Sequence, residues 1–291
     1  MNSITVKAYA KINLGLDVLR KRSDGYHDVC MIMQSLGLHD TITINKSTLP
    51  DISIKTNLSY LPIDKGNLVY KAAALFLETI SVKDGLFIQL DKKIPVAAGL
   101  AGGSSDAAAT LKGLNELYQA GLSQDELKKL GVKLGADVPY CIMLGTALSE
   151  GIGEVLTPLA PIPECSILLV KPDISVSTKY VYENLRLAGE IVHPDIPKMK
   201  TALTKGNLIT LADNMDNILQ TVTVKDYPII TNIKNKMIEL GALISLMSGS
   251  GPTVFGIYQD PLIAQKAFDY FKNHQSYGKQ VFLTKPYWQP S

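Results

Sequence analysis

The opening of the chain alternates apolar and other residues over an unusual length. Every second residue from Ile4 to Val18 is apolar, and Lys7, Lys11 and Asn13 lie between them. Because successive side chains of a strand point to opposite faces, this period of two predicts one long strand with a buried face. Lys11 and Asn13 are then expected to point the same way, on the face that the core does not use.

Patterns typical of strands and patterns typical of helices follow in the first half of the chain. A polar turn, two further strands and a helix are predicted, in that order, at residues 20–28, 40–45, 51–57 and 66–80. Ser123 and Glu126 have the spacing of a capping box, which predicts a helix that ends near Gly135. Strands first and helices afterwards favour an α+β fold.

A proline-rich stretch at residues 156–164 marks the predicted domain boundary, which divides the chain into residues 1–157 and 158–291. The second half reads as strand, helices, strand, strand, helix and strand, which is typical of a ferredoxin-like layer. Its elements are predicted at 166–172 (strand), 177–185 and 201–219 (helical), from Pro228 to Gly241 (helix), at 242–247 and 254–258 (strands), from Pro261 (helix) and at 280–284 (strand).

The stretch from Pro95 to Ala109, PVAAGLAGGSSDAAA, contains three glycines: Gly99, Gly102 and Gly103. It follows a predicted strand with a basic end, residues 87–95, and precedes a helix-forming run. Glycine allows sharp turns and leaves backbone N–H groups accessible, and serines can cap the helix that follows. Since a helix N-terminus attracts anions, this order of parts predicts a phosphate-binding loop. Close helix packing is the plain alternative.

Composition narrows the class of protein. The chain has 291 residues, enough for two domains, with 46% apolar and 19% charged residues. A net charge of +2 without a dense basic run argues against nucleic-acid binding. The widely spaced Cys30, Cys141 and Cys165 fit a reducing compartment. No apolar run approaches the ~20 residues of a membrane span, and Lys7 and Lys11 interrupt any signal-peptide core. We expect a cytoplasmic protein with no membrane partner.

Three parts of the sequence could together transfer a phosphoryl group. Such a reaction needs a phosphate cradle, a fixed cation and a group that orients or deprotonates the acceptor. The loop from Gly99 to Ser105 could be the cradle, Lys11 the cation and Asp137 the acid. Taken singly, Lys11 reads as a solvated strand residue and Asp137 as a turn former. The sequence has no P-loop, protein-kinase, G-x-S-x-G or zinc signature.

Four segments together resemble the GHMP kinase superfamily, namely residues 10–29, 95–108, 135–140 and 248–255. The DGYH run at residues 24–27 narrows the resemblance to the branch whose small-molecule substrate is a cytidine diphosphate-linked methylerythritol of the non-mevalonate isoprenoid pathway. The resemblance implies an α+β, two-domain fold, with an S5-like N-terminal domain and a ferredoxin-like C-terminal domain. It also implies phosphorylation of the substrate's 2-hydroxyl by ATP, with Mg²⁺.

The resemblance also assigns roles to residues. Asp137 would be the catalytic base, and Lys11 would hold it ionised and orient the hydroxyl. The ATP phosphates would bind Pro95, Val96, Ala97, Ala98, Gly99, Leu100, Ala101, Gly102, Gly103, Ser104 and Ser105. The adenine pocket would be lined by Asn67, Leu68 and Lys92, and the substrate would contact Asn13, Tyr26, His27 and Tyr182, the last of these stacking on cytosine. No acidic residue identifies itself as a Mg²⁺ ligand.

Other interpretations of these residues stay open. Asn67 could be a helix cap, Tyr182 a core aromatic, and Tyr26 and His27 parts of an ordinary turn. The loop has alanine at positions where the family often has glycine, and alanine is small enough to keep the cradle; these positions are Ala97, Ala98 and Ala101.

Three other functions compete with phosphorylation of the cytidine-linked substrate. Another GHMP kinase would act on mevalonate, homoserine or a sugar, and the aromatic set Tyr26, His27 and Tyr182 argues for a nucleotide-bearing acceptor instead. A non-catalytic nucleotide-binding module would not need Lys11 and Asp137. A dinucleotide oxidoreductase would need G-x-G-x-x-G within a βαβ unit, and the spacing here does not supply it.

Overall fold

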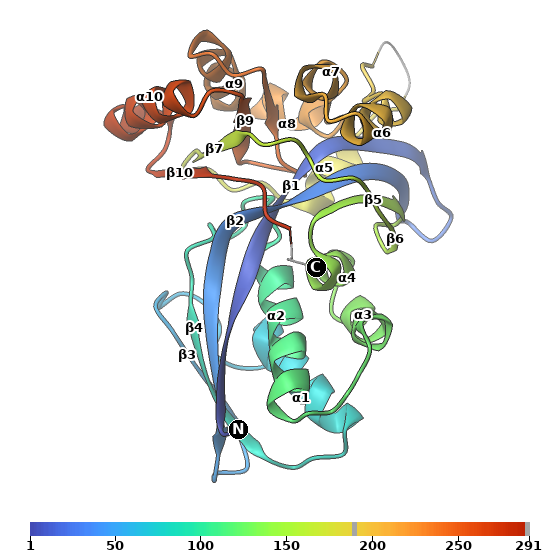
Figure 1. Ribbon diagram of the computed structural model, residues 1–291, viewed down its shortest axis with the longest axis vertical. Coiled ribbons are helices and arrows are strands. Elements are labelled where there is room, and N and C mark those ends of the chain that lie inside the picture. Colours follow the sequence, from blue (N-terminus) through green and yellow to red (C-terminus); the bar gives the residue numbers. More distant parts are fainter. Residues whose placement is uncertain (188–190, 289–291) are drawn as a thin grey trace. The chain divides into compact units, whose positions relative to one another are not determined.

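The computed structural model describes residues 1–187 and 191–288 (Figure 1). The described residues form two compact units, each built from separated segments of the chain. The first unit contains residues 1–10, 38–96 and 101–143, and the second contains 11–37, 97–100 and the described residues from 144 onward. The predicted boundary between residues 157 and 158 falls within the second unit, and a two-domain division at that point stays a prediction.

Two long strands contribute to both units. β1 (Ser3–Lys21) confirms the strand predicted from alternation, and it pairs with β2 (His27–Ser47). In the first unit, β2 pairs with β4 (Gly85–Asp91) in antiparallel fashion, and β4 pairs with β3 (Ile52–Thr56) in parallel. The strand prediction at 40–45 found only the second half of β2. Its first half is buried on both faces from Met31 to Leu36 and therefore shows no alternation.

Four helices complete the first unit, and their bounds are α1 (Leu68–Thr79), α2 (Gly102–Leu117), α3 (Gln124–Val132) and α4 (Val138–Met143). α2 packs against both α1 and α4. The run Ala107–Ala109 is buried, so small side chains let the helices approach closely. The predicted capping box is confirmed, because Ser123 and Glu126 satisfy each other's backbone N–H groups at the start of α3.

The second unit holds the other half of β2, which pairs with β5 (Thr146–Gly151), and β5 pairs with β6 (Val155–Pro158). It also holds a four-stranded antiparallel sheet with the order β10-β7-β9-β8. The bounds of its strands are β7 (Ser166–Lys171), β8 (Ile244–Met247), β9 (Val254–Tyr258) and β10 (Gln280–Thr284). Numbered along the chain, this order is fourth, first, third and second, as expected for the predicted ferredoxin-like layer.

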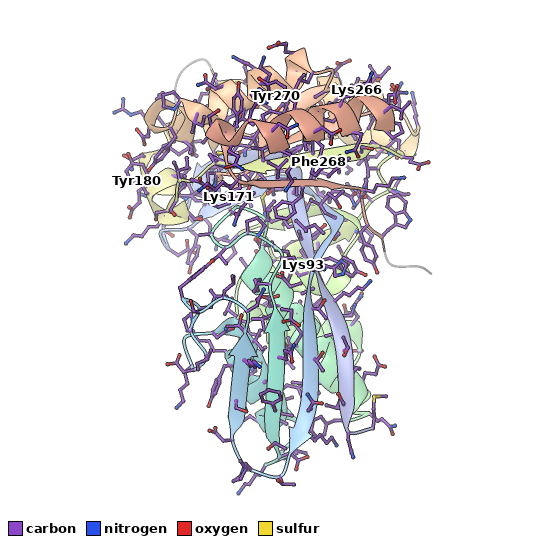
Figure 2. All side chains as sticks on the ribbon, turned by 90° about the vertical axis from the view of Figure 1, so that its left-hand side faces the viewer. Lys93, Lys171, Tyr180, Lys266, Phe268 and Tyr270 are labelled. Atoms are coloured by element: carbon purple, nitrogen blue, oxygen red, sulfur yellow. The ribbon has the colours of Figure 1, made fainter. Side chains whose placement is uncertain are left out.

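Helices α9 (Ile229–Glu239) and α10 (Pro261–Asn273) pack against this sheet. α9 begins and ends as the sequence predicts, since Pro228 precedes it and Gly241, with φ +90°, follows it, and α10 begins at the predicted Pro261. Figure 2 shows Phe268 and Tyr270 on α10, which buries Ala264 and Phe271 in the core of the unit.

In its described residues, the connection between β7 and α9 contains four short helices, α5 (Thr178–Asn184), α6 (Ile196–Thr204), α7 (Leu208–Asp213) and α8 (Gln220–Asp226). The helical segment predicted at 201–219 is interrupted, because Gly206 adopts φ +64° and Asn207 caps a new helix. A 3₁₀ turn, η1 (Gln275–Tyr277), precedes β10. Within the described ranges, no helix is both long enough and apolar enough to span a bilayer.

Candidate active site

Lys11 and Asn13 lie on the same side of β1, as the alternation predicts. The Lys11 ammonium donates to Asn13 Oδ1 over 2.8 Å. The expectation that this side of the strand avoids the core is wrong, because the two residues are only 5% and 1% exposed. Asn13 also donates to the sulfur of Met31 at 3.3 Å, so the neighbouring strand β2 helps to cover it.

The glycine turn at residues 248–253, between β8 and β9, lies against this pair. Gly249 adopts φ +57°, and a Cβ atom at this position would lie 3.5 Å from Asn13 Oδ1 and 3.6 Å from Lys11 Nζ. Gly251, with φ +87°, precedes a cis peptide bond to Pro252. The second glycine motif therefore brings backbone, rather than side chains, close to the buried lysine.

The apex of the first glycine loop, residues 97–100, also belongs to this group. The hydroxyl of Ser248 donates to the carbonyl of Gly99 over 2.9 Å, and the Lys11 N–H donates to the carbonyl of Leu100 over 3.1 Å. A Cβ atom at Gly99 would lie 2.1 Å from the Ser248 carbonyl oxygen. Three motifs that are far apart in the sequence thus meet within the second unit.

Two alanines of the loop adopt the left-handed conformation that glycine favours. Ala97 has φ +51° and Ala101 has φ +56°. The GHMP kinases, which the sequence resembles, often have glycine at these positions. The loop keeps its turns with alanine there, at some conformational cost.

Helix α2 begins without the serine cap that the sequence suggests. Its N-cap residue is Ala101, which makes no side-chain capping bond. The Ser105 hydroxyl instead donates to the carbonyl of Tyr9 and lies 3.3 Å from the sulfur of Cys141, so it holds the helix to its neighbours. A first turn without a side-chain cap leaves its N–H groups available for an anion.

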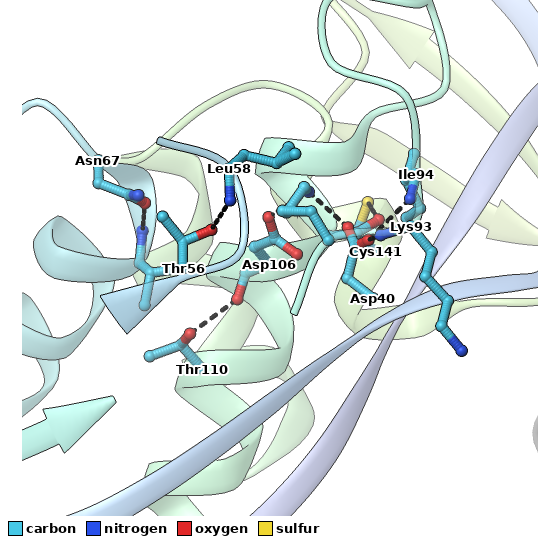
Figure 3. A network of polar contacts seen from close by, with 12 residues as sticks. Asp40, Thr56, Leu58, Asn67, Lys93, Ile94, Asp106, Thr110 and Cys141 are labelled. Atoms are coloured by element: carbon cyan, nitrogen blue, oxygen red, sulfur yellow. Dashed lines mark hydrogen bonds and ion pairs between the residues drawn. The ribbon is translucent and has the colours of Figure 1, made fainter. Parts of the chain in front are cut away.

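Residues predicted for the nucleotide gather at this start of α2 within the first unit. A Cβ atom at Gly103 would lie 3.4 Å from Leu68 Cδ1, and one at Gly102 would lie 3.2 Å from Lys92 Nζ. Asn67 caps α1, because it accepts from the N–H of Val69 over 2.9 Å (Figure 3). It also donates to the carbonyl of Pro62 in the preceding loop over 2.8 Å. Its local role is therefore the helix cap, and an adenine contact stays a prediction.

Lys92 lies in a buried network that the sequence analysis missed. Its ammonium donates to Asp40 and, over 2.6 Å, to Asp106, and both carboxylates are buried. The second oxygen of Asp40 accepts from the N–H groups of Lys93 and Ile94, so Asp40 is fully engaged (Figure 3). The sequence offered one signal, an acid at position 106 among buried alanines. Lys92 links β2, β4 and α2, and its predicted adenine contact remains untested.

The other carboxylate of this network differs from Asp40. Asp106 Oδ1 meets no hydrogen-bond partner among the described residues. Burial raises the pKa of Asp106 to about 8, and the negative Asp40 adds to this effect while Lys92 opposes it. One ammonium group neutralises two buried carboxyl groups best when one of them keeps its proton. Asp40 accepts from Lys92 and from two backbone N–H groups, whereas one oxygen of Asp106 meets no partner among the described residues, so we assign the proton to Asp106.

Asp137 directly precedes α4, which the sequence analysis did not predict because the helix is short. Its carbonyl accepts from the N–H of Cys141 over 3.1 Å, and its side chain is half-buried. Asp137 belongs to the first unit and Lys11 to the second. Their pairing stays a prediction.

Two of the predicted substrate residues meet in the second unit. The rings of His27 and Tyr182 have centroids 5.1 Å apart and an interplanar angle of 38°. Burial, with a smaller effect of Lys21, lowers the pKa of His27, which favours its neutral ring. Tyr26 is exposed on the turn between β1 and β2, and its role stays a prediction.

The helix that carries Tyr182 is joined to the glycine turn. The hydroxyl groups of Thr178, at the start of α5, and Ser250 lie 2.8 Å apart. The turn between β1 and β2 is itself held by ion pairs from Asp28 to Arg20 and Arg22. His27 and Tyr182 therefore belong to two elements that are each held in place by polar contacts.

The chain is similar to known proteins in both sequence and structure. The family model "GHMP kinases N terminal domain" matches residues 67–145, and "GHMP kinases C terminal" matches residues 199–276. The 4-diphosphocytidyl-2-C-methyl-D-erythritol kinase of Lachnoclostridium phytofermentans is 57% identical, over 98% of each chain. The enzyme of the same name from Lachnospira eligens is 49% identical, over 99% of each chain.

Solved structures agree with these matches. A crystal structure of 4-(cytidine 5'-diphospho)-2C-methyl-D-erythritol kinase is similar with a TM-score of 0.83 and 31% identity, over 98% of this chain and 100% of that one. Homoserine kinase from Cytophaga hutchinsonii has a TM-score of 0.79 at 20% identity, over 98% of this chain and 95% of that one, which shows a shared fold.

Proposed function

The chain belongs to the 4-diphosphocytidyl-2-C-methyl-D-erythritol kinases of the GHMP family, and from this membership we propose how its residues share the reaction. ATP donates its terminal phosphoryl group to the 2-hydroxyl of the cytidine diphosphate-linked methylerythritol. The observation that carries the proposal is the meeting of Lys11, Gly99 and Ser248 within one compact unit.

The first glycine loop and the start of α2 hold the ATP phosphates in this proposal. The loop has left-handed turns at Ala97, Gly99 and Ala101, and α2 begins without a side-chain cap. Backbone N–H groups and the positive end of the helix dipole then face the phosphates. Because these donors are fixed before ATP binds, they stabilise negative charge without reorganisation during the transfer.

Lys11 and Asp137 handle the acceptor hydroxyl. The hydrogen bond from Lys11 to Asn13 holds the ammonium group in place, and an ammonium group has three hydrogens with which it can donate. A lysine beside Asp137 would favour the ionised carboxylate, which can accept the hydroxyl proton. Asn13, from the same side of β1, would contact the substrate.

The cytidine group of the substrate binds beside His27 and Tyr182. A nucleobase stacks well on aromatic rings, and a neutral imidazole adds a face without a charge to desolvate. Tyr26, exposed on the adjacent turn, would form the rim of this site. This set distinguishes the substrate from mevalonate, homoserine and simple sugars, which carry no base.

Mg²⁺ is expected to arrive with ATP. Across the described ranges, no group of three or more His, Cys, Asp or Glu residues is arranged to hold a metal ion. The protein side chains alone therefore do not fit a dedicated metal cage, whereas Mg²⁺ is commonly held mainly by substrate phosphates and water.

The test is ATP consumption by the purified chain with a panel of acceptors. We expect turnover with 4-diphosphocytidyl-2-C-methyl-D-erythritol and none above background with mevalonate, homoserine or galactose. Product analysis should place the new phosphate on the 2-hydroxyl. Turnover with one of the other acceptors at a similar kcat/KM would overturn the substrate assignment, and ATP binding without turnover on any acceptor would favour a non-catalytic module.

A further inference from the structure

Asn217 is a fully buried amide in the second unit, with 0% exposure. Its Nδ2 atom donates to the carbonyls of Met247 and Gly249, each over 2.7 Å. Its Oδ1 atom accepts from the N–H of Leu219 over 3.0 Å. Both amide hydrogens and the amide oxygen are thus used on backbone groups, and no aliphatic residue of similar size could replace these bonds.

The two carbonyls that Asn217 holds are on either side of Ser248. In a trans peptide, the C=O and the following N–H point in opposite directions. Since the Gly249 carbonyl faces Asn217, the N–H of Ser250 faces away from it. The amide of Asn217 therefore sets the direction of the peptide dipole within the glycine turn at 248–253, with the positive end outward.

The backbone around Asn217 is tied to the strand that carries Lys11. The Leu16 N–H donates to the carbonyl of Asp216 over 2.9 Å, and the Ile218 N–H donates to the carbonyl of Leu16 over 3.0 Å. Asn217 thus connects β1 with the glycine turn. Its chain neighbours bond to β1, and its side chain bonds to the turn. A shift of Asn217 would move the turn relative to Lys11.

We infer that Asn217 is a positioning residue for phosphoryl transfer. It holds the glycine turn against Lys11 and Asn13 and under the Gly99 carbonyl, without touching the reacting atoms itself. The expected effect on turnover rests on the proposed function. The role of Asn217 in holding the glycine turn does not. Positioning contributes strongly to phosphoryl transfer, and small displacements of the fixed groups reduce turnover.

The kinetic test compares Asn217→Ala and Asn217→Ser with Asn214→Ala. Asn214 is a matched control, because it follows α7 directly and its side-chain amide donates to the carbonyl of Thr210 within that helix. We expect Asn217→Ala to lower kcat by about tenfold to a hundredfold while the KM for ATP changes less than about threefold. Asn217→Ser, which can donate one bond, should fall between wild type and alanine, and Asn214→Ala should match wild type.

The second readout needs no substrate. Hydrogen–deuterium exchange should show faster exchange in the peptide that covers residues 248–253 of Asn217→Ala, with the amides of α10 unchanged. If Asn217→Ala does not fold, Asn217→Ser carries both tests. Wild-type kcat together with unchanged exchange in the turn would overturn the inference, as would equal losses in Asn217→Ala and Asn214→Ala. If the wild-type chain fails to phosphorylate the cytidine-linked acceptor, the proposed function fails, and the exchange result alone decides the role of Asn217.

Discussion

The ammonium group of Lys11 donates a hydrogen bond to Asn13 across 2.8 Å, and both side chains are buried on one side of β1. A lysine normally keeps considerable rotamer freedom, which costs about 2 kcal/mol to fix. Here the strand and the amide fix it before any ligand binds. The lysine therefore has the rigidity that a catalytic cation needs.

Replacing this lysine should remove turnover without unfolding the chain. We expect Lys11→Met to lower kcat by about a hundredfold or more, because the charge that stabilises the transferring phosphoryl group is lost while the alkyl stem is kept. Steady-state ATP consumption measures the effect. Lys7 is the control, since it lies on the same side of β1 but is exposed, and Lys7→Met should keep wild-type kinetics. Comparable losses in both variants would contradict a special role for Lys11.

Replacing the proposed base should separate binding from chemistry. Asp137→Asn keeps the size of the side chain but cannot accept the hydroxyl proton, so kcat should fall about 10²–10⁴-fold with ATP affinity nearly unchanged. Calorimetry with a non-hydrolysable ATP analogue measures the affinity. Asp125, exposed and paired with Lys128 at the start of α3, supplies the control Asp125→Asn. Normal turnover in Asp137→Asn would remove Asp137 from the mechanism.

A methyl group at Gly99 should disrupt the phosphate loop. The new Cβ atom would lie 2.1 Å from the carbonyl oxygen of Ser248, and φ is +75°. We expect Gly99→Ala to raise the KM for ATP by about tenfold or more, because the apex of the loop must move. Gly121→Ala separates conformational strain from the clash, since Gly121 has φ +69° and nothing within 4 Å of a Cβ atom. That control should cost about 1–2 kcal/mol of stability and leave the KM for ATP unchanged.

The pKa of Asp106 predicts a pH dependence of stability. The folded chain raises this pKa from the ordinary 3.8 to about 8, chiefly through burial. The folded state then binds the proton more tightly than the unfolded state, so the stabilisation is complete below pH 4 and is lost as the pH rises toward 8. Asp106→Asn has no such proton. Its free energy of unfolding relative to wild type should therefore increase with pH, by up to about 1.4 kcal/mol per unit.

Urea unfolding of both chains at several values between pH 5 and pH 9 measures this difference. It should rise up to about pH 8 and level off above it. A difference that stays flat over this range would mean that Asp106 is ionised in the folded chain. In that case the buried network would carry a net negative charge.

The aromatic pair gives a prediction about the substrate alone. Tyr182→Leu should raise the KM for the cytidine-linked acceptor by about tenfold, because a base loses its stacking surface, while the KM for ATP stays unchanged. Tyr180 supplies the control on the same helix. It is exposed and bonds to Asp226, and Figure 2 labels it. Equal effects of Tyr180→Leu and Tyr182→Leu would point to a general disturbance of α5.

Local patterns in the sequence predicted much of the fold. The alternation from Ile4 to Val18 predicted β1, and Ser123 with Glu126 predicted the start of α3. The strand order of the second sheet agrees with the ferredoxin-like expectation. The same reasoning missed the first half of β2, because strands buried on both faces lose the period of two.

The sequence offers candidate site residues only where motifs carry the chemistry. The glycine loops and Lys11 stand out along the chain, whereas the partners that hold them do not. Asp40 is separated from Lys92 by 52 residues, and Asn217 is separated from Gly249 by 32 residues. Such pairings depend on how strands and loops meet in space, so no local pattern reveals them. The burial of Lys11 was missed for the same reason, because the turn that lies against it comes from the far end of the sequence.

The interleaving of the two compact units has a consequence for how such a chain can be inherited and rebuilt. Even a segment as short as the first glycine loop contributes residues to both units, because residues 97–100 belong to one unit and the flanking residues to the other. No single crossover in the gene can therefore transfer one unit without segments of the other. Any recombinant that joins the front of one relative to the back of another must therefore combine foreign surfaces within at least one of the units.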